Sequence, residues 1–279
     1  MKRIVTIQDI SCVGKCSLTV ALPILSAMGL ECAILPTAVL STHTMFRGYT
    51  FRDLTDDLPG IADHWEAEGI DFEAIYTGYL GSARQLEIVE DFFTRFGKSA
   101  SIVIDPVMAD NGKLYPGFTE AFAQRMALLC AHADIILPNL TEASYLLKIP
   151  YPGDCYTRSD IEEILRRLAA LGPRVAVLTG ISFEPGRLGV MAYDKENDCF
   201  FEYYRERLPA AFHGTGDIFA SAFTGALARG KSVQDSLCVA VDYTVDCIDL
   251  TLSDPNHRTY GVNFEEALPA LCAAFAPGK

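Results

Sequence analysis

The sequence predicts an α/β fold with a central, mostly parallel sheet, helices on both faces and a small antiparallel hairpin. Two observations predict it. Up to residue 178, short apolar runs alternate with amphipathic segments of helical length, which is the pattern of βαβ units around a parallel sheet. Beyond that point, two strand-like runs flank the polar pentapeptide DKEND, which indicates a hairpin. No linker, low-complexity tract or internal repeat interrupts the pattern, so we expect one domain over residues 1–279.

The first half of the chain contributes strand–helix pairs in order. RIVTI is a short apolar run that predicts a strand over Arg3–Ile7, and SLTVALPILSAM predicts a helix over Ser17–Met28 in spite of Pro23. The same alternation predicts three more pairs: Glu31–Leu35 with Leu54–Glu68, Ala74–Tyr76 with Ala83–Phe96, and Ile102–Asp105 with Phe118–Leu129.

The second half begins with the same rhythm and then changes. A strand at Ile135–Leu137 precedes a helix that Thr141 and Glu142 open, and the next helix is expected at Asp160–Leu171, where Ser159 and Glu162 have capping-box spacing. The strand Arg174–Leu178 is followed by the hairpin strands Leu188–Tyr193 and Cys199–Tyr204. Helices are then expected at Ile218–Arg229, Val233–Leu250 and Phe264–Phe275, with Asn263 and Glu266 as a candidate cap for the last.

Composition and charge exclude several classes of function. The formal net charge is −13 and no run of Lys or Arg occurs, whereas a nucleic-acid surface or an anionic membrane needs a positive patch in its partner. No apolar run is long enough to cross a bilayer. The nine cysteines lack paired metal-binding spacing, and their odd number without a signal peptide predicts reduced thiols in a cytoplasmic protein.

Polar and glycine residues concentrate where strands of the predicted sheet end. Ligands of open parallel sheets bind outside the carboxyl ends of the strands, so these positions are the candidate site. They are Gln8-Asp9, 37–44, 78–81, Asp105-Pro106, 139–142, Thr179-Gly180 and the stretch FHGTGDIFASAFTGALARG at 212–230.

Two familiar phosphate-binding loops do not fit. VGKCS at 13–17 resembles a Walker loop, but that motif requires glycine at Asp9 and Ser or Thr at Cys16. GTGDIF at 214–219 lacks the third glycine of the dinucleotide fingerprint and lies far from the first strand.

The tetrapeptide GTGD at 214–217 has two interpretations. Backbone N–H groups at a helix start, flanked by Gly214 and Gly216, can bind a phosphate, and Asp217 would then accept the proton of a hydroxyl that attacks it. The alternative is a glycine turn with Asp217 as a helix cap. These residues alone do not separate the two.

A second acidic set comes from DPVMAD at 105–110 and PNLTEASYL at 138–146. Asp105, Asn139 and Glu142 would follow neighbouring strands, and Mg²⁺ takes few protein ligands while it bridges substrate phosphates. Glu142 alone is explained as well by a carboxylate in the first turn of a helix.

Together these motifs resemble the ribokinase-like superfamily, and within it the pyridoxal kinases of vitamin B6 salvage. The shared segments are GTGD, DPVM, PN-x-x-E, TGYLGS at 77–82 and STHT at 41–44, in the family order along the whole chain. GTGD is common to the superfamily, whereas TGYLGS with S-x-HT is more specific.

The resemblance implies a role for individual residues. Asp217 matches the base that deprotonates the 5′-hydroxymethyl group of the vitamer, and Gly214, Thr215 and Gly216 match the anion hole for the γ-phosphate. On the ATP and Mg²⁺ side the matching residues are Asp105, Asp110, Asn139, Glu142 and Thr179, of which Asp105 and Glu142 face the metal, in part through water. On the vitamer side they are Asp9, His43, Thr44 and Tyr79.

The resemblance also implies ATP and Mg²⁺ as cofactors, a monovalent cation such as K⁺, and a homodimer. Two residues depart from the family. Asp9 stands where relatives carry serine, and we hypothesise that it favours a cationic substituent such as the aminomethyl group of pyridoxamine; His213 is expected to be a solvent-facing loop residue. The rival functions are a hydroxymethylpyrimidine kinase of thiamine synthesis and a non-catalytic binding protein.

Overall fold

The structure is a computed structural model that describes residues 1–276. Its strands are β1 Arg3–Ser11, β2 Glu31–Leu40, β3 Phe51–Asp53, β4 Ala74–Thr77, β5 Ser101–Ile104, β6 Ala109–Asp110, β7 Lys113–Leu114, β8 Ile135–Ile136, β9 Val175–Ile181, β10 Arg187–Asp194 and β11 Cys199–Glu206. Its helices are α1 Leu18–Ala27, α2 Leu58–Ala67, α3 Ala83–Phe96, α4 Glu120–Cys130, α5 Leu140–Leu147, α6 Arg158–Ala170, α7 Thr215–Ala228, α8 Val233–Ser253 and α9 Phe264–Ala274.

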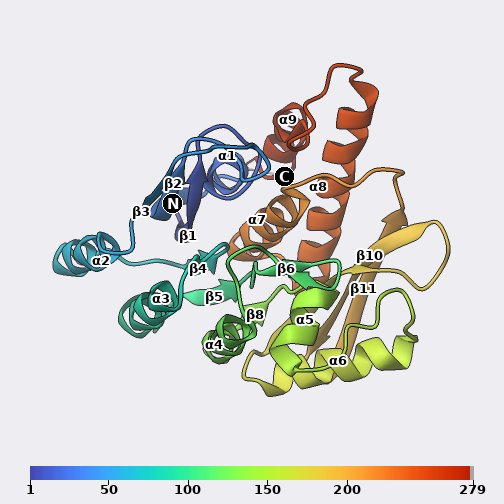
Figure 1. The fold of residues 1–279 in the computed structure, drawn as a ribbon, viewed down its shortest axis with the longest axis horizontal. Helices are drawn as coiled ribbons and strands as arrows, with labels where there is room; N and C mark the ends of the chain where they lie inside the picture. The colour runs from blue at the N-terminus through green and yellow to red at the C-terminus, as the bar shows by residue number, and fades with distance from the viewer. Residues whose placement is uncertain (277–279) are drawn as a thin grey trace.

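Nine strands form one sheet in the order β11-β10-β9-β8-β5-β4-β1-β2-β3 (Figure 1). The six strands from β9 to β2 pair in parallel, whereas β10, β11 and β3 pair antiparallel with their neighbours. The predicted fold class is therefore confirmed, and the predicted hairpin is the β10–β11 pair at one edge of the sheet.

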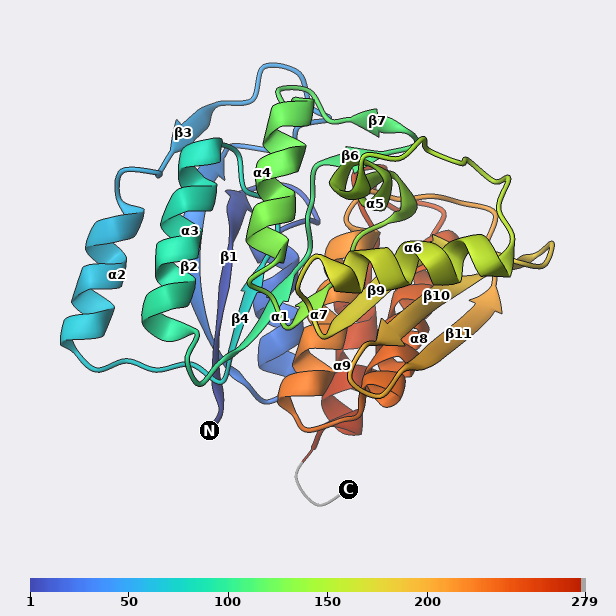
Figure 2. The ribbon, with the colours of Figure 1, turned by 90° about the horizontal axis from the view of Figure 1, so that it is seen from below.

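Helices cover both faces of the sheet and enclose two apolar cores (Figure 2). Helices α2 to α6 pack on one face, and α1, α7, α8 and α9 pack on the other. Successive residues of a strand alternate between the two cores, as Ile4 and Val5 of β1 do. This alternation explains why the central strands are continuously apolar in sequence.

Two predicted strand ends are wrong. Thr179 and Gly180 lie within β9, which runs on to Ile181 beside β10, and Gln8 and Asp9 lie within β1. Strand β1 continues to Ser11 through a bulge between Gln8 and Ile10, because β2 extends through Pro36 and pairs with it as far as Leu40. Polar residues in QDIS suggested a strand end, but pairing with a neighbour decides where a strand ends. Asp9 consequently lies on a rigid strand.

Several local predictions also need correction. Helix α2 begins at Leu58, because Leu54–Asp57 forms a turn and Pro59 occupies the first turn of the helix. Thr157 and Asp160 form the capping box of α6, two residues before the predicted pair, Ser159 and Glu162. Asn263 is the N-cap residue of α9, but its side chain makes no cap hydrogen bond.

Strands β3, β6 and β7 have no counterpart in the sequence prediction, because runs of two or three residues carry no periodic signal. Residues 1–276 contain no helix long and apolar enough to span a membrane.

Candidate active site

A cavity of about 380 Å³ opens where β5, β8 and β9 end and α7 begins. Nine predicted site residues line it: Asp105, Asp110, Asn139, Glu142, Thr179, Gly214, Thr215, Gly216 and Asp217. They come from four segments that lie far apart in the sequence, at 105–110, 139–142, 179 and 214–217. The topology therefore brings together the residues that were expected to face ATP and Mg²⁺.

The N-terminus of α7 presents free backbone N–H groups to this cavity. The first helical hydrogen bond runs from the Ile218 N–H to the Gly214 carbonyl (3.0 Å), so no such bond uses the N–H groups of Thr215, Gly216 and Asp217. Gly214 has φ +81°, and a Cβ there would overlap the Lys15 carbonyl oxygen, whereas a Cβ at Gly216 would meet no atom within 4 Å. Packing thus explains the first glycine but not the second, whose absent side chain leaves open space at the cavity.

The half-buried Asp217 stands in the first turn of α7. Burial, with a smaller contribution from the charge of Asp9, raises the pKa of its carboxyl to about 7, although the backbone N–H of Ser17 lowers it in part. A carboxyl with a pKa near neutrality can accept a proton and return it at physiological pH, as a general base must.

Asp105 and Glu142 form a buried acidic pair in the same cavity. Burial raises the pKa of the Asp105 carboxyl, and the charges of Glu142 and Asp217 raise it further. Burial likewise raises the pKa of Glu142, although N–H groups of Asn139 and Met108 donate to its carboxylate at 2.9 and 3.1 Å. No Lys or Arg within residues 1–276 forms an ion pair with either carboxylate.

Asn139 and Glu142 also form the capping box of α5. The Asn139 Oδ1 accepts from the Glu142 N–H at 2.9 Å, and the Asn139 Nδ2 donates to the Ala109 carbonyl at 2.8 Å. The helix-start interpretation of Glu142 is therefore confirmed, and the polar atoms of the Asn139 amide already have protein partners.

The acidic pair fits Mg²⁺ bound together with substrate phosphates. Residues 1–276 hold no group of three or more His, Cys, Asp or Glu side chains placed to bind a metal by themselves. Mg²⁺ commonly takes one or two carboxylates and completes its shell with water and phosphate oxygens. Two buried carboxylates without a cationic partner match that need, because a divalent cation would relieve their mutual repulsion.

The four residues predicted for the vitamer do not line the 380 Å³ cavity. Asp9, 5% exposed, accepts hydrogen bonds from Ser11 and Ser17. The His43 ring lies 5.2 Å from that of His213, and the Tyr79 ring lies 5.5 Å from Phe118, while Thr44 is exposed. His213 is exposed as expected, but it also packs on His43 at the rim of the cavity.

Comparison with known proteins identifies the family. Residues 28–263 match the phosphomethylpyrimidine kinase family. The chain belongs to this family. Pyridoxal and pyridoxine kinases are among its relatives, so the resemblance read from the sequence is correct at the level of the family and of the ribokinase-like fold.

Three relatives define how near this kinase lies to known ones. A Bacteroides thetaiotaomicron protein named for phosphomethylpyrimidine kinase activity is 40% identical with a TM-score of 0.93, over 97% of this chain and 93% of that one. Pyridoxal kinase from Lactobacillus plantarum is 32% identical with a TM-score of 0.90, over 98% of each chain. The pyridoxine kinase of Bacillus subtilis is 30% identical over 185 residues, which span 65% of each protein.

Two residues of this kinase carry contacts to the site that the sequence did not mark. Ser17 was expected as an ordinary helix residue, yet its backbone has φ 52°, its hydroxyl donates to Asp9, and its N–H lowers the pKa of the Asp217 carboxyl. Arg207 is the one Lys or Arg among the residues that line the cavity within the described part of the chain. Ser17 lies in VGKCS and begins the predicted helix, but neither pattern indicates a positive φ or a bond to Asp9, and Arg207 stands in no motif.

Proposed function

We propose that this kinase transfers the γ-phosphoryl group of ATP to the 5′-hydroxymethyl group of a vitamin B6 vitamer, which is pyridoxal, pyridoxine or pyridoxamine. The observation that carries the proposal is the Asp217 carboxyl, with a pKa of about 7, beside the free N–H groups that begin α7 in an acidic cavity. The relatives support the vitamer. The Bacteroides thetaiotaomicron protein was also solved with pyridoxal, at 41% identity, and the Lactobacillus plantarum relative is a pyridoxal kinase.

In the proposed reaction Asp217 accepts the proton of the vitamer hydroxyl. The oxygen of that hydroxyl attacks the γ-phosphorus of ATP, and the bond between the γ-phosphorus and the bridging oxygen of ADP breaks. The N–H groups at residues 215–217 donate to the phosphoryl oxygens as negative charge builds on them. Gly216 leaves the space that this approach needs. When bound, Mg²⁺ held by Asp105 and Glu142 would offset the charge of the ATP phosphates.

The vitamer would lie on the β1–β2–β4 side of Asp217, next to His43, Thr44 and Tyr79. The charge of Asp9 raises the pKa of both Asp217 and Tyr79, although burial is the larger cause for each, and this shared influence supports a vitamer site between them. Asp9 is also proposed to favour a cationic vitamer, although both its oxygens already accept hydrogen bonds from serine hydroxyls. A wild-type preference for pyridoxal that persists in Asp9→Ser would contradict this role of Asp9.

Hydroxymethylpyrimidine is the rival acceptor, because the matched family and the Bacteroides thetaiotaomicron relative are both named for phosphomethylpyrimidine kinase. ATP consumption measured in parallel with pyridoxal, pyridoxine, pyridoxamine and hydroxymethylpyrimidine separates the two functions. We expect the highest kcat/KM with a B6 vitamer. A higher value with hydroxymethylpyrimidine would refute the proposed substrate.

The variant Asp217→Asn tests the base. We expect unchanged ATP affinity and a loss of kcat of about 10²-fold or more, because an amide cannot take up the proton. Asp235→Asn is a matched control, since Asp235 is the third residue of α8 as Asp217 is of α7, but its exposed carboxylate pairs with Ser232. Near-normal turnover of Asp217→Asn would remove Asp217 from the mechanism.

A further inference from the structure

Ser17 has a backbone conformation that a serine rarely adopts. Its φ is 52° and its ψ is −136°, and it is 6% exposed in the turn between β1 and α1. Glycine reaches positive φ without strain, whereas a Cβ makes this region unfavourable. A serine kept in this conformation must be held there by its surroundings, and such strain clusters at functional sites.

The Ser17 side chain does not do what its position suggests. Ser17 is the N-cap residue of α1, yet its hydroxyl caps no helical N–H group. The hydroxyl instead donates to Oδ1 of Asp9 at 2.6 Å, and Ser11 donates to Oδ2 at 3.1 Å. Ser17 therefore binds the carboxylate of Asp9, and its backbone N–H also lowers the pKa of the Asp217 carboxyl.

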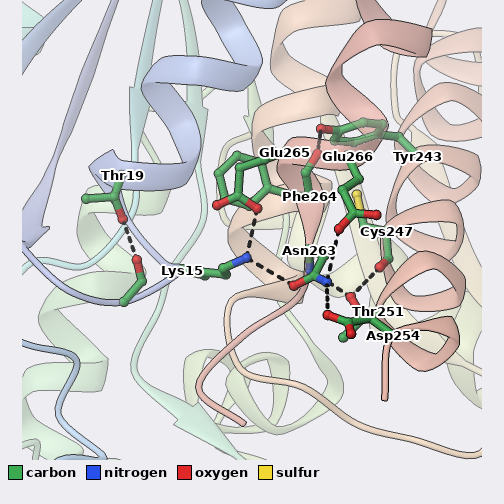
Figure 3. Close-up of polar contacts among 11 residues, drawn as sticks. Lys15, Thr19, Tyr243, Cys247, Thr251, Asp254, Asn263, Phe264, Glu265 and Glu266 are labelled. Atoms are coloured by element: carbon green, nitrogen blue, oxygen red, sulfur yellow. Dashed lines mark hydrogen bonds and ion pairs between the residues drawn. The ribbon is translucent and has the colours of Figure 1, made fainter. Parts of the chain in front are cut away.

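The segment that carries Ser17 is fixed from two sides. Figure 3 shows the Lys15 ammonium between α9 and its preceding turn, with Nζ 2.8 Å from Oε2 of Glu265 and 3.3 Å from Oδ1 of Asn263. On the other side, the Lys15 carbonyl lies against Gly214, the residue before α7. The turn is therefore clamped between the C-terminal part of the chain and the start of the catalytic helix.

We propose that Ser17 is a positioning residue for the phosphoryl transfer: its hydroxyl holds the Asp9 carboxylate in the turn that packs against the start of α7, the helix that carries Asp217. This inference rests on the proposed role of Asp217 as the base. A serine is needed because glycine would supply the N–H group but not the hydroxyl.

The electrostatic consequence is a base tuned by its neighbour. The negative charge of Asp9 raises the pKa of Asp217, and the Ser17 hydroxyl favours the ionised form of Asp9. The titratable groups whose charges couple to Asp217 are Asp9, Cys16, Tyr76, Asp105 and Tyr115. The Ser17 hydroxyl donates a 2.6 Å hydrogen bond to Asp9 and also lowers the pKa of the neighbouring Cys16 thiol, which burial raises.

The experiment compares Ser17→Gly, Asp9→Asn and the double variant through the pH dependence of kcat/KM. Ser17→Gly keeps the N–H group and relieves the backbone strain, but it removes the hydroxyl that stabilises ionised Asp9. Asp9 is then ionised less often, so its charge raises the pKa of Asp217 less. We expect the acid limb to move to lower pH by about half a unit or more in both single variants. We expect no further movement in the double variant, because the hydroxyl acts through Asp9.

A merely structural Ser17 would give a different result. Ser17→Gly would keep the wild-type pH dependence of kcat/KM, and Ser17→Ala, which retains the strained backbone, would show only a lower Tm. That result, or additive shifts in the double variant, would overturn the inference. Ser232→Gly is the matched control, because Ser232 is an exposed N-cap serine whose hydroxyl does cap its helix, and its loss should leave the profile unchanged.

A carboxyl ¹³C NMR titration measures the same change in the pKa of Asp217 without turnover. The resonance of Asp217 is identified as the one that disappears in Asp217→Asn. The two levels of the argument fail separately. Turnover by Asp217→Asn would remove the proposed base, whereas a wild-type titration curve in Ser17→Gly would remove only the role of Ser17.

Discussion

The two glycines of the GTGD segment should respond in opposite ways to the same substitution. Gly214 needs its positive φ of +81°, and an added Cβ would overlap the Lys15 carbonyl oxygen. Gly216 lies within the first turn of α7, and an added Cβ would meet nothing within 4 Å. Alanine at 214 should therefore damage the fold, and alanine at 216 should damage only the chemistry.

The structure gives the expected size of each effect. A left-handed non-glycine residue costs about 1–2 kcal/mol, and displacing a backbone carbonyl adds to that, so Gly214→Ala should destabilise the fold by at least about 2 kcal/mol. For a chain of this size that lowers Tm by roughly 4–8 °C. Gly216→Ala should instead gain up to about 1 kcal/mol, since alanine favours a helix over glycine.

The activity of Gly216→Ala should fall by about 10²-fold in kcat/KM for ATP, the scale on which the loss of one oxyanion-stabilising donor is felt. Thermal unfolding and steady-state kinetics on both variants check the pair. Full activity of Gly216→Ala would show that no phosphate approaches its N–H group. A wild-type Tm for Gly214→Ala would show that the clash with Lys15 is not a constraint.

Two further predictions follow from the buried acids. In the wild type, kcat/KM for the vitamer should fall as the pH drops through about 7, because the base must be ionised and the pKa of the Asp217 carboxyl is raised to about 7; a profile flat down to pH 5 would contradict this. Asp105→Asn should raise Tm at neutral pH without nucleotide while it lowers activity, measured by calorimetry and turnover. Burial raises the pKa of the Asp105 carboxyl, so the stability that the neutral carboxyl contributes is present at low pH and is lost as the pH rises. Asparagine is neutral at every pH and therefore keeps that stability. An unchanged or lower Tm would refute the argument.

Part of this site could be predicted because it depends on local chemistry. Polar residues that follow a strand, such as Asp105 after β5, lie at one edge of the sheet in any parallel α/β fold. The glycines at 214 and 216 marked the start of a helix by their lack of side chains. Glu142 had two local interpretations, and the capping box confirms one of them while leaving its carboxylate at the cavity.

Other features depend on partners that are remote in sequence. Strand β1 runs past Gln8 because β2 extends beside it, and no property of QDIS itself reveals that pairing. Asn263 is the N-cap residue of α9, but its Oδ1 accepts from Lys15, which is 248 positions away. Competition between a local cap and a distant lysine is resolved only when the chain is folded.

The sequence by itself determined the longer strands and helices, the candidate ligand site and the acids available there, because periodicity, turn chemistry and motif spacing are local. The tertiary structure alone decided how those acids interact. Burial and the charge of Asp9 raise the pKa of Asp217 to about 7, and Ser17 is held at positive φ with its hydroxyl on Asp9. Desolvation and charge coupling depend on distances across the fold, which the spacing of residues along the chain does not contain.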